Sequence, residues 1–155
     1  MKALQRCIPG RLVRRSPGKT FAGGDVRESG EARDMNRTAL LERYLQAIQA
    51  RDLDAILALF SPTATVSHPV FGEQSAAEFF PALLAGTASD TPTGTLLLHA
   101  EGPTSAVYFE DDWTTPDGRH FQNPIVLLFD FDPQGLTERL RVVFDTASLR
   151  GGLGA

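Results

Sequence analysis

Three side chains in this 155-residue sequence have types that suit proton transfer: Tyr44, His68 and Asp111. A histidine imidazole has an unperturbed pKa of about 6.5, so His68 could act as a general acid or base at neutral pH. A tyrosine hydroxyl can donate a hydrogen bond to a carbonyl oxygen or an oxyanion, and a carboxyl group can orient an imidazole. Together these groups would suit chemistry on a carbonyl compound.

Each of the three residues also has a simpler explanation. His68 precedes Pro69 and could only cap the end of a strand. Tyr44 could be a core residue whose hydroxyl reaches the surface, as is common for tyrosine on an apolar helix face. Asp111 could be solvated, if a bulge in its strand reverses the alternation of side chains.

Alternation along the segment SAVYFEDDWTT decides where Asp111 is expected to point. A period of two places Asp111 on the same face as Phe109 and Trp113, so all three would face one cavity. A carboxyl group in that position must be protonated, solvated or paired. We expect it to pair with His68, so that the two groups activate water or shuttle a proton.

The elements that must position these residues begin with two helices and a strand between residues 38 and 69. Thr38 can cap a first helix and Asp52 a second one, and Pro62 excludes further helix. The β-branched residues after Pro62 favour a strand that ends at His68. The apolar positions at helical spacing are Leu40, Leu41, Tyr44, Leu45 and Ile48 in the first helix, and Leu53, Ile56, Leu57 and Phe60 in the second.

The second half of the chain changes from helical to strand periodicity. Residues 72–84 predict a helix that Ser75 caps, that buries Phe79 and Phe80, and that Pro81 kinks or ends early; residues 85–94 read as a surface loop. Four strands are expected at 95–101, 105–114, 119–131 and 136–146, with turn sequences between them. The expected fold is α+β, with three helices covering one face of a strongly curved antiparallel sheet around an apolar pocket.

Composition divides the chain in two. Residues 1–35 carry eight Lys or Arg and four Asp or Glu, with glycines and prolines that favour disorder. This basic leader could be a targeting or nucleic-acid arm, a segment with no role, or an untranslated stretch if synthesis starts at Met35. Residues 36–155 form one expected domain with 7 basic and 15 acidic residues and no lysine, which argues against binding to nucleic acid.

Several classes of protein are not indicated. No apolar run approaches the 18–20 or so residues that cross a bilayer, and no secretory signal is visible, so we expect a cytoplasmic protein with no membrane partner. Cys7 has no partner cysteine, and we expect His99 and His120 to lie at the surface or at an edge of the sheet. The histidines lack metal-site spacing, and there is no phosphate-binding glycine loop or Gly-x-Ser-x-Gly elbow, so no metal and no cofactor are expected.

Two stretches of sequence resemble a known group. The order helix, helix, strand, helix and long meander, from about Met35 to the end, resembles the nuclear transport factor 2-like (NTF2-like) cone fold, and the segment RYLQAIQARDLDAILALFSPTATVSHPV resembles the opening of its ketosteroid isomerases. This superfamily holds ketosteroid isomerases, SnoaL-like polyketide cyclases and limonene-epoxide hydrolases. The end of the chain, FDTASLRGGLG (144–154), resembles the closing motif of SnoaL-like domains, in which an aromatic–Asp pair, here Phe144 and Asp145, is followed by Leu and then by Leu-Gly.

The closest detailed resemblance is to ketosteroid isomerase, and it implies roles for single residues. Tyr44 falls on the tyrosine that donates to the oxyanion, and His68 falls on the aspartate that serves as base. The second oxyanion donor would correspond to Val126 or Leu127, both apolar, and losing such a donor costs roughly 3–4 kcal/mol of transition-state stabilisation.

The expected ligand pocket follows from the fold and the resemblance together. Its expected members, which could equally be plain core, are Phe60, Phe71, Phe79, Phe80, Trp113, Val126 and Asp145. The expected function is a cofactor-independent isomerase or cyclase that transfers a proton on a small apolar carbonyl compound. The alternative is a binding or assembly module without catalysis, and the resemblance implies a homodimer formed through the sheet.

Overall fold

The computed structural model describes residues 25–100 and 102–147. The expectations for residues 1–24, including Cys7, and for the part of the closing motif after residue 147 therefore lie outside the described residues. The described chain contains three helices and six strands. The helices are α1 (Asp25–Ala50), α2 (Leu53–Leu57) and α3 (Ala76–Gly86), and the strands are β1 (Phe60–His68), β2 (Gly72–Ser75), β3 (Ser89–His99), β4 (Thr104–Thr114), β5 (His120–Phe131) and β6 (Thr137–Phe144).

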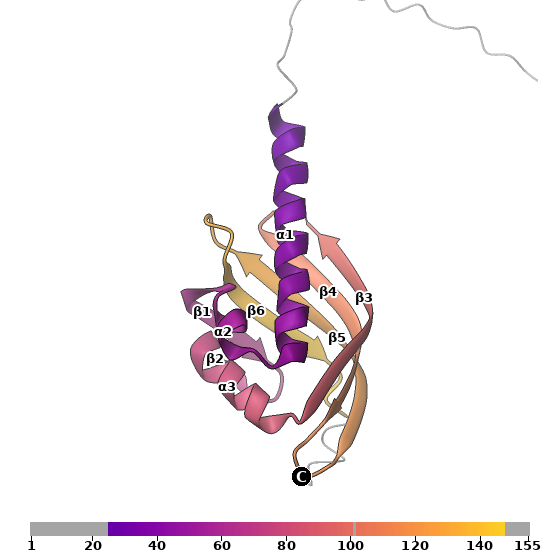
Figure 1. Cartoon of the computed structure of the whole chain (residues 1–155). Helices are drawn as coiled ribbons and strands as arrows, with labels where there is room; N and C mark the ends of the chain where they lie inside the picture. Colours follow the sequence, from indigo (N-terminus) through magenta and orange to yellow (C-terminus); the bar gives the residue numbers. More distant parts are fainter. Residues whose placement is uncertain (1–24, 101, 148–155) are drawn as a thin grey trace, which may run out of the picture.

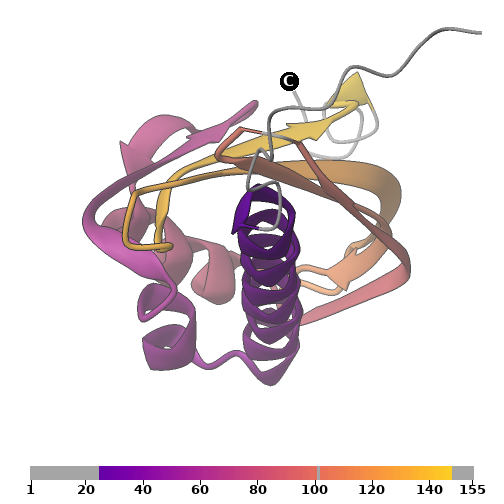
Figure 2. The ribbon, with the colours of Figure 1, turned by 90° about the horizontal axis from the view of Figure 1, so that it is seen from above.

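The six strands form one open, strongly curved sheet in the order β2-β1-β6-β5-β4-β3. The helices lie on its concave side, with α1 running through the hollow of the sheet (Figures 1 and 2). The expected α+β class and curved sheet are confirmed. The expectation of a purely antiparallel sheet is wrong, because β1 pairs in parallel with β6 after the chain has crossed over through α3 and the meander.

The meander of β3 to β6 is antiparallel, as its turn sequences predicted. Strands β4 and β5 pair without a bulge, from the pair Thr104 and Asp130 to the pair Thr114 and His120. Glycines with positive φ lie in the turns on either side of β5, with Gly118 at 84° and Gly135 at 86°, a conformation that side chains with a Cβ adopt only at a cost. An unbroken register keeps the alternation of inward and outward side chains constant along both strands.

The core forms where α1 meets the sheet. The Tyr44 ring packs edge-to-face on Phe129 of β5, with the ring centroids 5.1 Å apart, and also on Phe60 and Phe80 at 6.2 and 6.1 Å. The helical spacing predicted this buried face correctly, since Leu41 and Tyr44 are both buried. These contacts attach α1 to β1, α3 and β5 at once.

Helix α1 begins earlier than the sequence suggested. It starts at Asp25 rather than near Thr38, so the expectation of disorder is wrong for residues 25–35. These residues include no proline and several good helix formers, so Gly30 costs about 1 kcal/mol relative to alanine without ending the helix. Arg37 holds this part of α1 on the sheet, with its guanidinium 5.4 Å from the ring centroid of Phe131.

Other boundaries also differ from the expected ones. Phe60 opens β1 and is not part of α2, which ends at Leu57. Strand β2 was not predicted, and β3 begins at Ser89 inside the stretch read as a loop. Both are edge strands of the sheet. Pro92 is tolerated in β3 because one side of an edge strand needs no hydrogen-bond donor. Helix α3 continues past Pro81 to Gly86, and its Ser75 cap is confirmed by a capping box with Glu78.

No helix in the part of the chain that the structure describes is long and apolar enough to cross a membrane.

The packing of α1 on β5 yields a stability prediction. Replacing the fully buried Phe129 with alanine removes the ring that contacts Tyr44 and should lower the free energy of unfolding by about 3–5 kcal/mol. Chemical denaturation measures this loss. Gln122→Ala, at an exposed position of the same strand, should change stability by no more than about 0.5 kcal/mol. Equal losses in the two variants would show that this contact does not anchor the fold.

Candidate functional site

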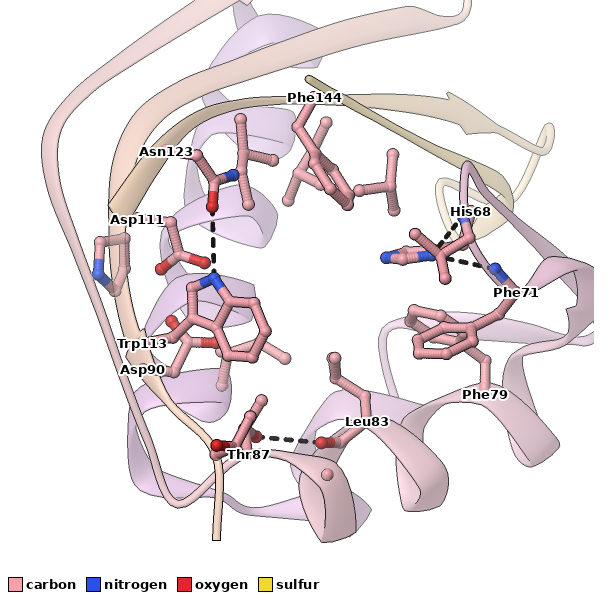
Figure 3. Close-up of a pocket in the computed structure, with 18 of the residues that line it drawn as sticks. His68, Phe71, Phe79, Leu83, Thr87, Asp90, Asp111, Trp113, Asn123 and Phe144 are labelled. Atoms are coloured by element: carbon pink, nitrogen blue, oxygen red, sulfur yellow. Dashed lines mark hydrogen bonds between the residues drawn. The ribbon is translucent and has the colours of Figure 1, made fainter. Parts of the chain in front are cut away.

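A cavity of about 460 Å³ lies between the concave face of the sheet, α1 and α3 (Figure 3). This volume is within the range of sites that bind small molecules, about 300–1,000 Å³. Most of the wall is apolar. The apolar side chains that line it are Leu45, Ile48, Val70, Phe71, Phe79, Leu83, Phe109, Trp113, Ile125, Leu127, Val142 and Phe144.

The structure brings the three predicted chemical residues to this one cavity. Tyr44 enters it from α1, His68 from the end of β1 and Asp111 from β4. Of the residues expected to line the pocket, Phe71, Phe79 and Trp113 also do so.

Four of the expected pocket residues lie elsewhere. Phe60 and Phe80 are core residues packed on one another, with ring centroids 4.9 Å apart, and do not reach the cavity. Val126 faces the outer side of the sheet, because alternation turns its neighbours Ile125 and Leu127 inward. Asp145 is exposed after the end of β6, where its Oδ1 accepts a hydrogen bond from the backbone N–H of Ala147 at 2.9 Å.

His68 is held in one orientation by the turn that follows it. Its Nδ1 accepts hydrogen bonds from the backbone N–H groups of Val70 and Phe71, at 3.2 and 3.3 Å. A ring nitrogen that accepts hydrogen bonds must be unprotonated. The proton of the neutral imidazole therefore lies on Nε2, which points into the cavity (Figure 3). Burial lowers the pKa of His68 to about 4. At neutral pH the ring is therefore an uncharged hydrogen-bond donor to the cavity.

Asp111 faces the cavity, as alternation along β4 predicted, and is 6% exposed. The expected pairing with His68 is wrong, because the two residues lie on opposite walls (Figure 3). The neighbour of Asp111 is instead Asp90, at the start of β3, in a segment that the sequence analysis read as a surface loop.

The surroundings of the two carboxyl groups affect their pKa values differently. Burial first, and then the charge of Asp90 and a hydrogen bond with it, raise the pKa of Asp111 to about 8. Burial also raises the pKa of Asp90, but its hydrogen bond with Asp111 and the charge of Arg51 act in the opposite direction. At neutral pH Asp111 is consequently the protonated member of the pair and Asp90 the one that ionises first.

Tyr44 completes this polar end of the cavity. Burial, followed by the charges of Asp90 and Asp111, raises the pKa of Tyr44 far above its usual range. The hydroxyl therefore keeps its proton and can serve only as a neutral donor or acceptor of hydrogen bonds. Its ring belongs to the core described above, which fixes the position of the hydroxyl.

Asn123 is a further polar residue of the site and lies directly opposite Asp111 in the register of β4 and β5. Its Oδ1 accepts a hydrogen bond from Nε1 of Trp113 at 3.3 Å. Among the described residues, Asn123 Nδ2 and Asp111 Oδ1 are buried and have no hydrogen-bond partner. Buried polar atoms without partners are costly, so these two atoms indicate where a ligand would bind.

The end of α1 supports the segment that carries Asp90. Arg51, with a φ of 56°, follows the helix, and its Nη1 donates to the carbonyl oxygen of Thr87 at 2.6 Å. Its Nη2 donates to the carbonyl oxygen of Leu84. These bonds join α1 to the link between α3 and β3, three residues before Asp90.

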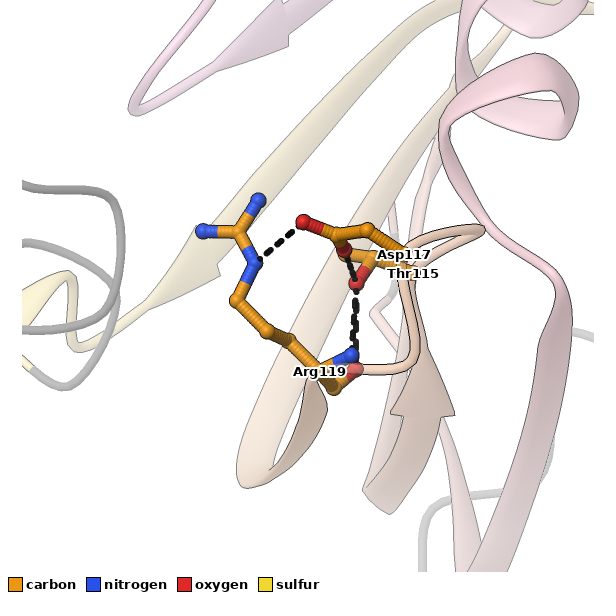
Figure 4. A network of polar contacts seen from close by, with 3 residues as sticks. All are labelled: Thr115, Asp117 and Arg119. Carbon is orange, nitrogen blue, oxygen red and sulfur yellow. Dashed lines mark hydrogen bonds and ion pairs between the residues drawn. The ribbon is translucent and has the colours of Figure 1, made fainter.

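A hairpin at one edge of the cavity is ordered by its own hydrogen bonds (Figure 4). The Thr115 hydroxyl accepts from the backbone N–H of Arg119 at 3.0 Å and donates to the Asp117 carboxylate, which also accepts from Arg119 Nε at 2.9 Å. The hydrogen bonds from Thr115 and Arg119 hold the pKa of Asp117 below its usual range.

Sequence reasoning missed two members of the site. Asn123 could have been found by extending the period of two along FQNPIVLLF, which puts it on the same face as Ile125 and Leu127. Asp90 has no such signal, because it lies among turn-forming residues. No group of three His, Cys, Asp or Glu side chains suited to a metal ion is found among residues 25–100 and 102–147.

His99 and His120, expected at the surface or at an edge of the sheet, make specific contacts outside the cavity. His99 is half-buried, and its ring nitrogens bond the hydroxyls of Thr38 at 2.8 Å and Ser105 at 2.9 Å. His120 is exposed, as expected, and contacts the Asp112 carboxylate at 2.5 Å.

The architecture of this chain, a curved sheet closed by three helices around a cavity, is that of the NTF2-like superfamily. The family model of the SnoaL-like domain matches residues 41–139, and the chain belongs to this family.

Solved structures share the fold at low sequence identity. An NTF2-like protein of unknown function from Burkholderia pseudomallei superposes with a TM-score of 0.65 at 21% identity, over 77% of this chain and 98% of that one. A candidate polyketide cyclase from Xanthomonas campestris has a TM-score of 0.67 at 14% identity, over 76% and 96%. SalBIII, an epoxide hydrolase/cyclase-like enzyme with a role in pyran ring formation in the polyether salinomycin, has a TM-score of 0.59 at 24% identity, over 72% and 92%. Identities this low establish the fold alone.

The environment of His68 predicts an unusual titration. Its ring should stay neutral, with the proton on Nε2, until the pH falls to about 4, and ¹⁵N NMR of the imidazole nitrogens would show both the tautomer and the midpoint. Since the unfolded chain binds this proton at about 6.5, acidification from pH 6.5 to 4 should destabilise the fold through His68. A His68 midpoint near 6.5 would contradict the assigned environment.

Proposed function

We propose that the cavity binds a small apolar carbonyl compound and transfers a proton on it without a cofactor, as an isomerase or cyclase does. The observation that carries this proposal is the buried pair of Asp90 and Asp111 at one end of a mostly apolar cavity, where both charges act on the buried Tyr44. Two carboxyl groups whose surroundings separate their pKa values provide an acid and a base at the same pH.

Each group then has a separate task. The ionised Asp90 removes a proton from the carbon next to the carbonyl group, and the protonated Asp111 and Tyr44 donate hydrogen bonds to the enolate oxygen. Return of the same proton from Asp90 to another carbon yields an isomer. Attack of the enolate carbon on a second carbonyl carbon yields a ring, with the new alkoxide taking its proton from an acid of the site.

This assignment changes the roles expected from the sequence. His68 would bind as a neutral donor instead of acting as the base, since its Nδ1 already accepts two backbone N–H groups. The second oxyanion donor was expected at Val126 or Leu127. Of these two apolar residues only Leu127 lines the cavity, and the neutral Asp111 would supply that hydrogen bond from the neighbouring strand. Tyr44 keeps the donor role that the resemblance implied.

The relatives support the same class of chemistry. A candidate polyketide cyclase and an epoxide hydrolase/cyclase-like enzyme share the fold, and both descriptions concern ring formation. The competing function is ligand binding without turnover, which the apolar wall and the fixed imidazole of His68 would also serve.

Exchange of α-protons of ketones in D₂O, followed by NMR, tests the proposal without knowledge of the natural substrate. Asp111→Asn should lower the rate of exchange about 100-fold or more while ketones still bind. In the wild type, kcat/KM should fall as the pH rises through about 8, because Asp111 loses its proton there.

Asp112→Asn is the matched control for this experiment. Asp112 is the next residue on β4, but it faces the outer side of the sheet, where it contacts His120 at 2.5 Å. This variant should exchange protons at close to the wild-type rate, because the charge of Asp112 is the smallest of the causes that raise the pKa of Asp111. Ketone binding without exchange by the wild type would favour the non-catalytic function, and undiminished exchange by Asp111→Asn would remove the carboxyl pair from the mechanism.

We also propose that the outer face of the sheet forms a homodimer. Cross-strand partners on this face make an apolar row, and Figure 2 shows no helix over it in the described chain. The row consists of Leu96, Tyr108, Val126 and Val143, with Leu98 and Leu128 beside it. Leu96, Leu98 and Val143 are each more than half exposed, with 52%, 53% and 51% of their surface accessible.

Charge favours a second copy as the occupant of this face. Glu110 and Asp112 of β4 lie on one side of the row and Arg141 of β6 on the other. A two-fold axis lying in this face, perpendicular to the line from Glu110 to Arg141, would place Glu110 of each copy over Arg141 of the other and so bring unlike charges together.

Sedimentation velocity tests the dimer. The wild type should sediment as a dimer at micromolar concentration, and the double variant Leu98→Glu/Val143→Glu as a folded monomer, because two buried charges would oppose association. Met35→Glu, at a position 68% exposed on α1 and away from this face, should leave the dimer intact. A monomeric wild type would refute the proposal.

A further inference from the structure

Two polar ends of the cavity face each other across apolar side chains (Figure 3), and the hairpin of Thr115, Asp117 and Arg119 lies at a further edge. At one end lie Asp90, Asp111 and Asn123. At the other end lies His68, on β1. The proposed chemistry uses the first end only, so the structure leaves the role of His68 to be explained.

The His68 imidazole is a single hydrogen-bond donor in aromatic surroundings. Its ring stacks on Phe71 with the centroids 4.7 Å apart and contacts the rings of Phe144 and Phe79 at 5.3 and 5.5 Å. Nδ1 is occupied by two backbone donors, which leaves Nε2–H directed at the cavity. An apolar ligand that covered this N–H would leave it without a partner, at a cost in affinity, whereas an acceptor oxygen would satisfy it.

The opposite end has its own unmet requirements. Asn123 Nδ2 and Asp111 Oδ1 are buried without hydrogen-bond partners among the described residues, and both residues are 6% exposed. The orientation of Asn123 is set by the hydrogen bond from Trp113, so its amide N–H groups remain available. A ligand that fills the cavity therefore meets unpaired polar atoms at both ends.

We propose that the site selects ligands with two oxygen functions at opposite ends of a flat apolar body, one accepting from His68 Nε2–H and the other lying against Asp111 and Asn123. This inference rests on the proposed function in one respect, namely which of the two oxygens lies at the reacting end of the cavity. His68 is a specificity-determining residue that binds the distant oxygen.

The nature of this donor also determines which kind of ligand oxygen can accept its hydrogen bond. An uncharged imidazole surrounded by phenyl rings offers one N–H and no positive charge, so a carbonyl, quinone or ether oxygen fits it better than a carboxylate, whose desolvation would not be offset. An ammonium group would find no acceptor there. The selected class is thus neutral diketones, quinones and related compounds.

Two substitutions separate the functions of the two imidazole nitrogens. The amide oxygen of His68→Asn reaches the Nδ1 position and can still accept from the turn, but the side chain is too short to replace Nε2–H. His68→Gln places an amide near the Nε2 position and can donate to the ligand. Figure 3 shows both features, the turn and the cavity, on either side of the ring.

The probes are trans-decalin-2,6-dione and perhydroanthracene-2,6-dione, each compared with its monoketone by isothermal titration calorimetry. Two lengths are used so that one of them matches the distance between the two ends. For the matching length, the wild type should bind the diketone about 5-fold more tightly than the monoketone, the size expected for one net hydrogen bond. His68→Asn should abolish this preference with little change for the monoketone, and His68→Gln should retain most of it.

Several outcomes would overturn the inference: equal affinities for diketone and monoketone at both lengths, binding of neither compound, or an equal loss of affinity for both ketones in His68→Asn. The result is independent of catalysis. If wild-type protein binds diketones preferentially but exchanges no α-protons, the proposed function fails and the inference about His68 stands. If Asp111→Asn stops exchange while His68→Asn leaves the preference intact, the inference fails alone.

Discussion

The contact on which the rest of the structure depends is the one between Tyr44 and the sheet. The ring packs edge-to-face on Phe129 and on the rings of β1 and α3, which fixes α1 inside the curved sheet. The hydroxyl of the same side chain reaches the cavity beside Asp90 and Asp111. One residue therefore belongs to the core and to the site, so the packing that stabilises the fold also sets the position of a donor in the site. Aromatic residues with a polar end commonly have this double use.

The polar end of the cavity shows how burial can produce reactivity. A carboxyl group taken out of water would be expensive if it were charged, and Asp111 avoids this cost by keeping its proton while Asp90, which Arg51 favours in the charged form, ionises first. The same low polarity that disfavours the second charge strengthens each hydrogen bond made to a ligand there. Burial disfavours the charged form of His68 as well. For a histidine this lowers the pKa, so the ring is a neutral hydrogen-bond donor.

Much of this arrangement could be predicted from the sequence, and the failures have identifiable causes. Periodicity located the buried face of α1 and turned Asp111 inward, because both patterns depend on local geometry alone. The partner of Asp111 depended on which strand lies next to β4, and Asp90 sits in a segment whose composition resembles a loop. The role of His68 could not be read from its type, because two backbone N–H groups in the following turn decide which nitrogen carries the proton. Val126 was misplaced because its position was taken from the resemblance, whereas the period of two along β5 turns Ile125 and Leu127 inward and Val126 outward.

The curvature of the sheet has a mechanical consequence. His68 belongs to β1 and Asp90 to β3, which stand near opposite edges of a six-stranded sheet that does not close on itself. The two residues nevertheless reach a common interior, because the sheet bends round α1. A ligand bound at both ends of the cavity would hold these two edge regions of the sheet at a fixed distance from each other. Occupancy of the cavity would then restrain the movement of the two edge regions relative to each other, including parts of β1 and β3 that the ligand does not touch.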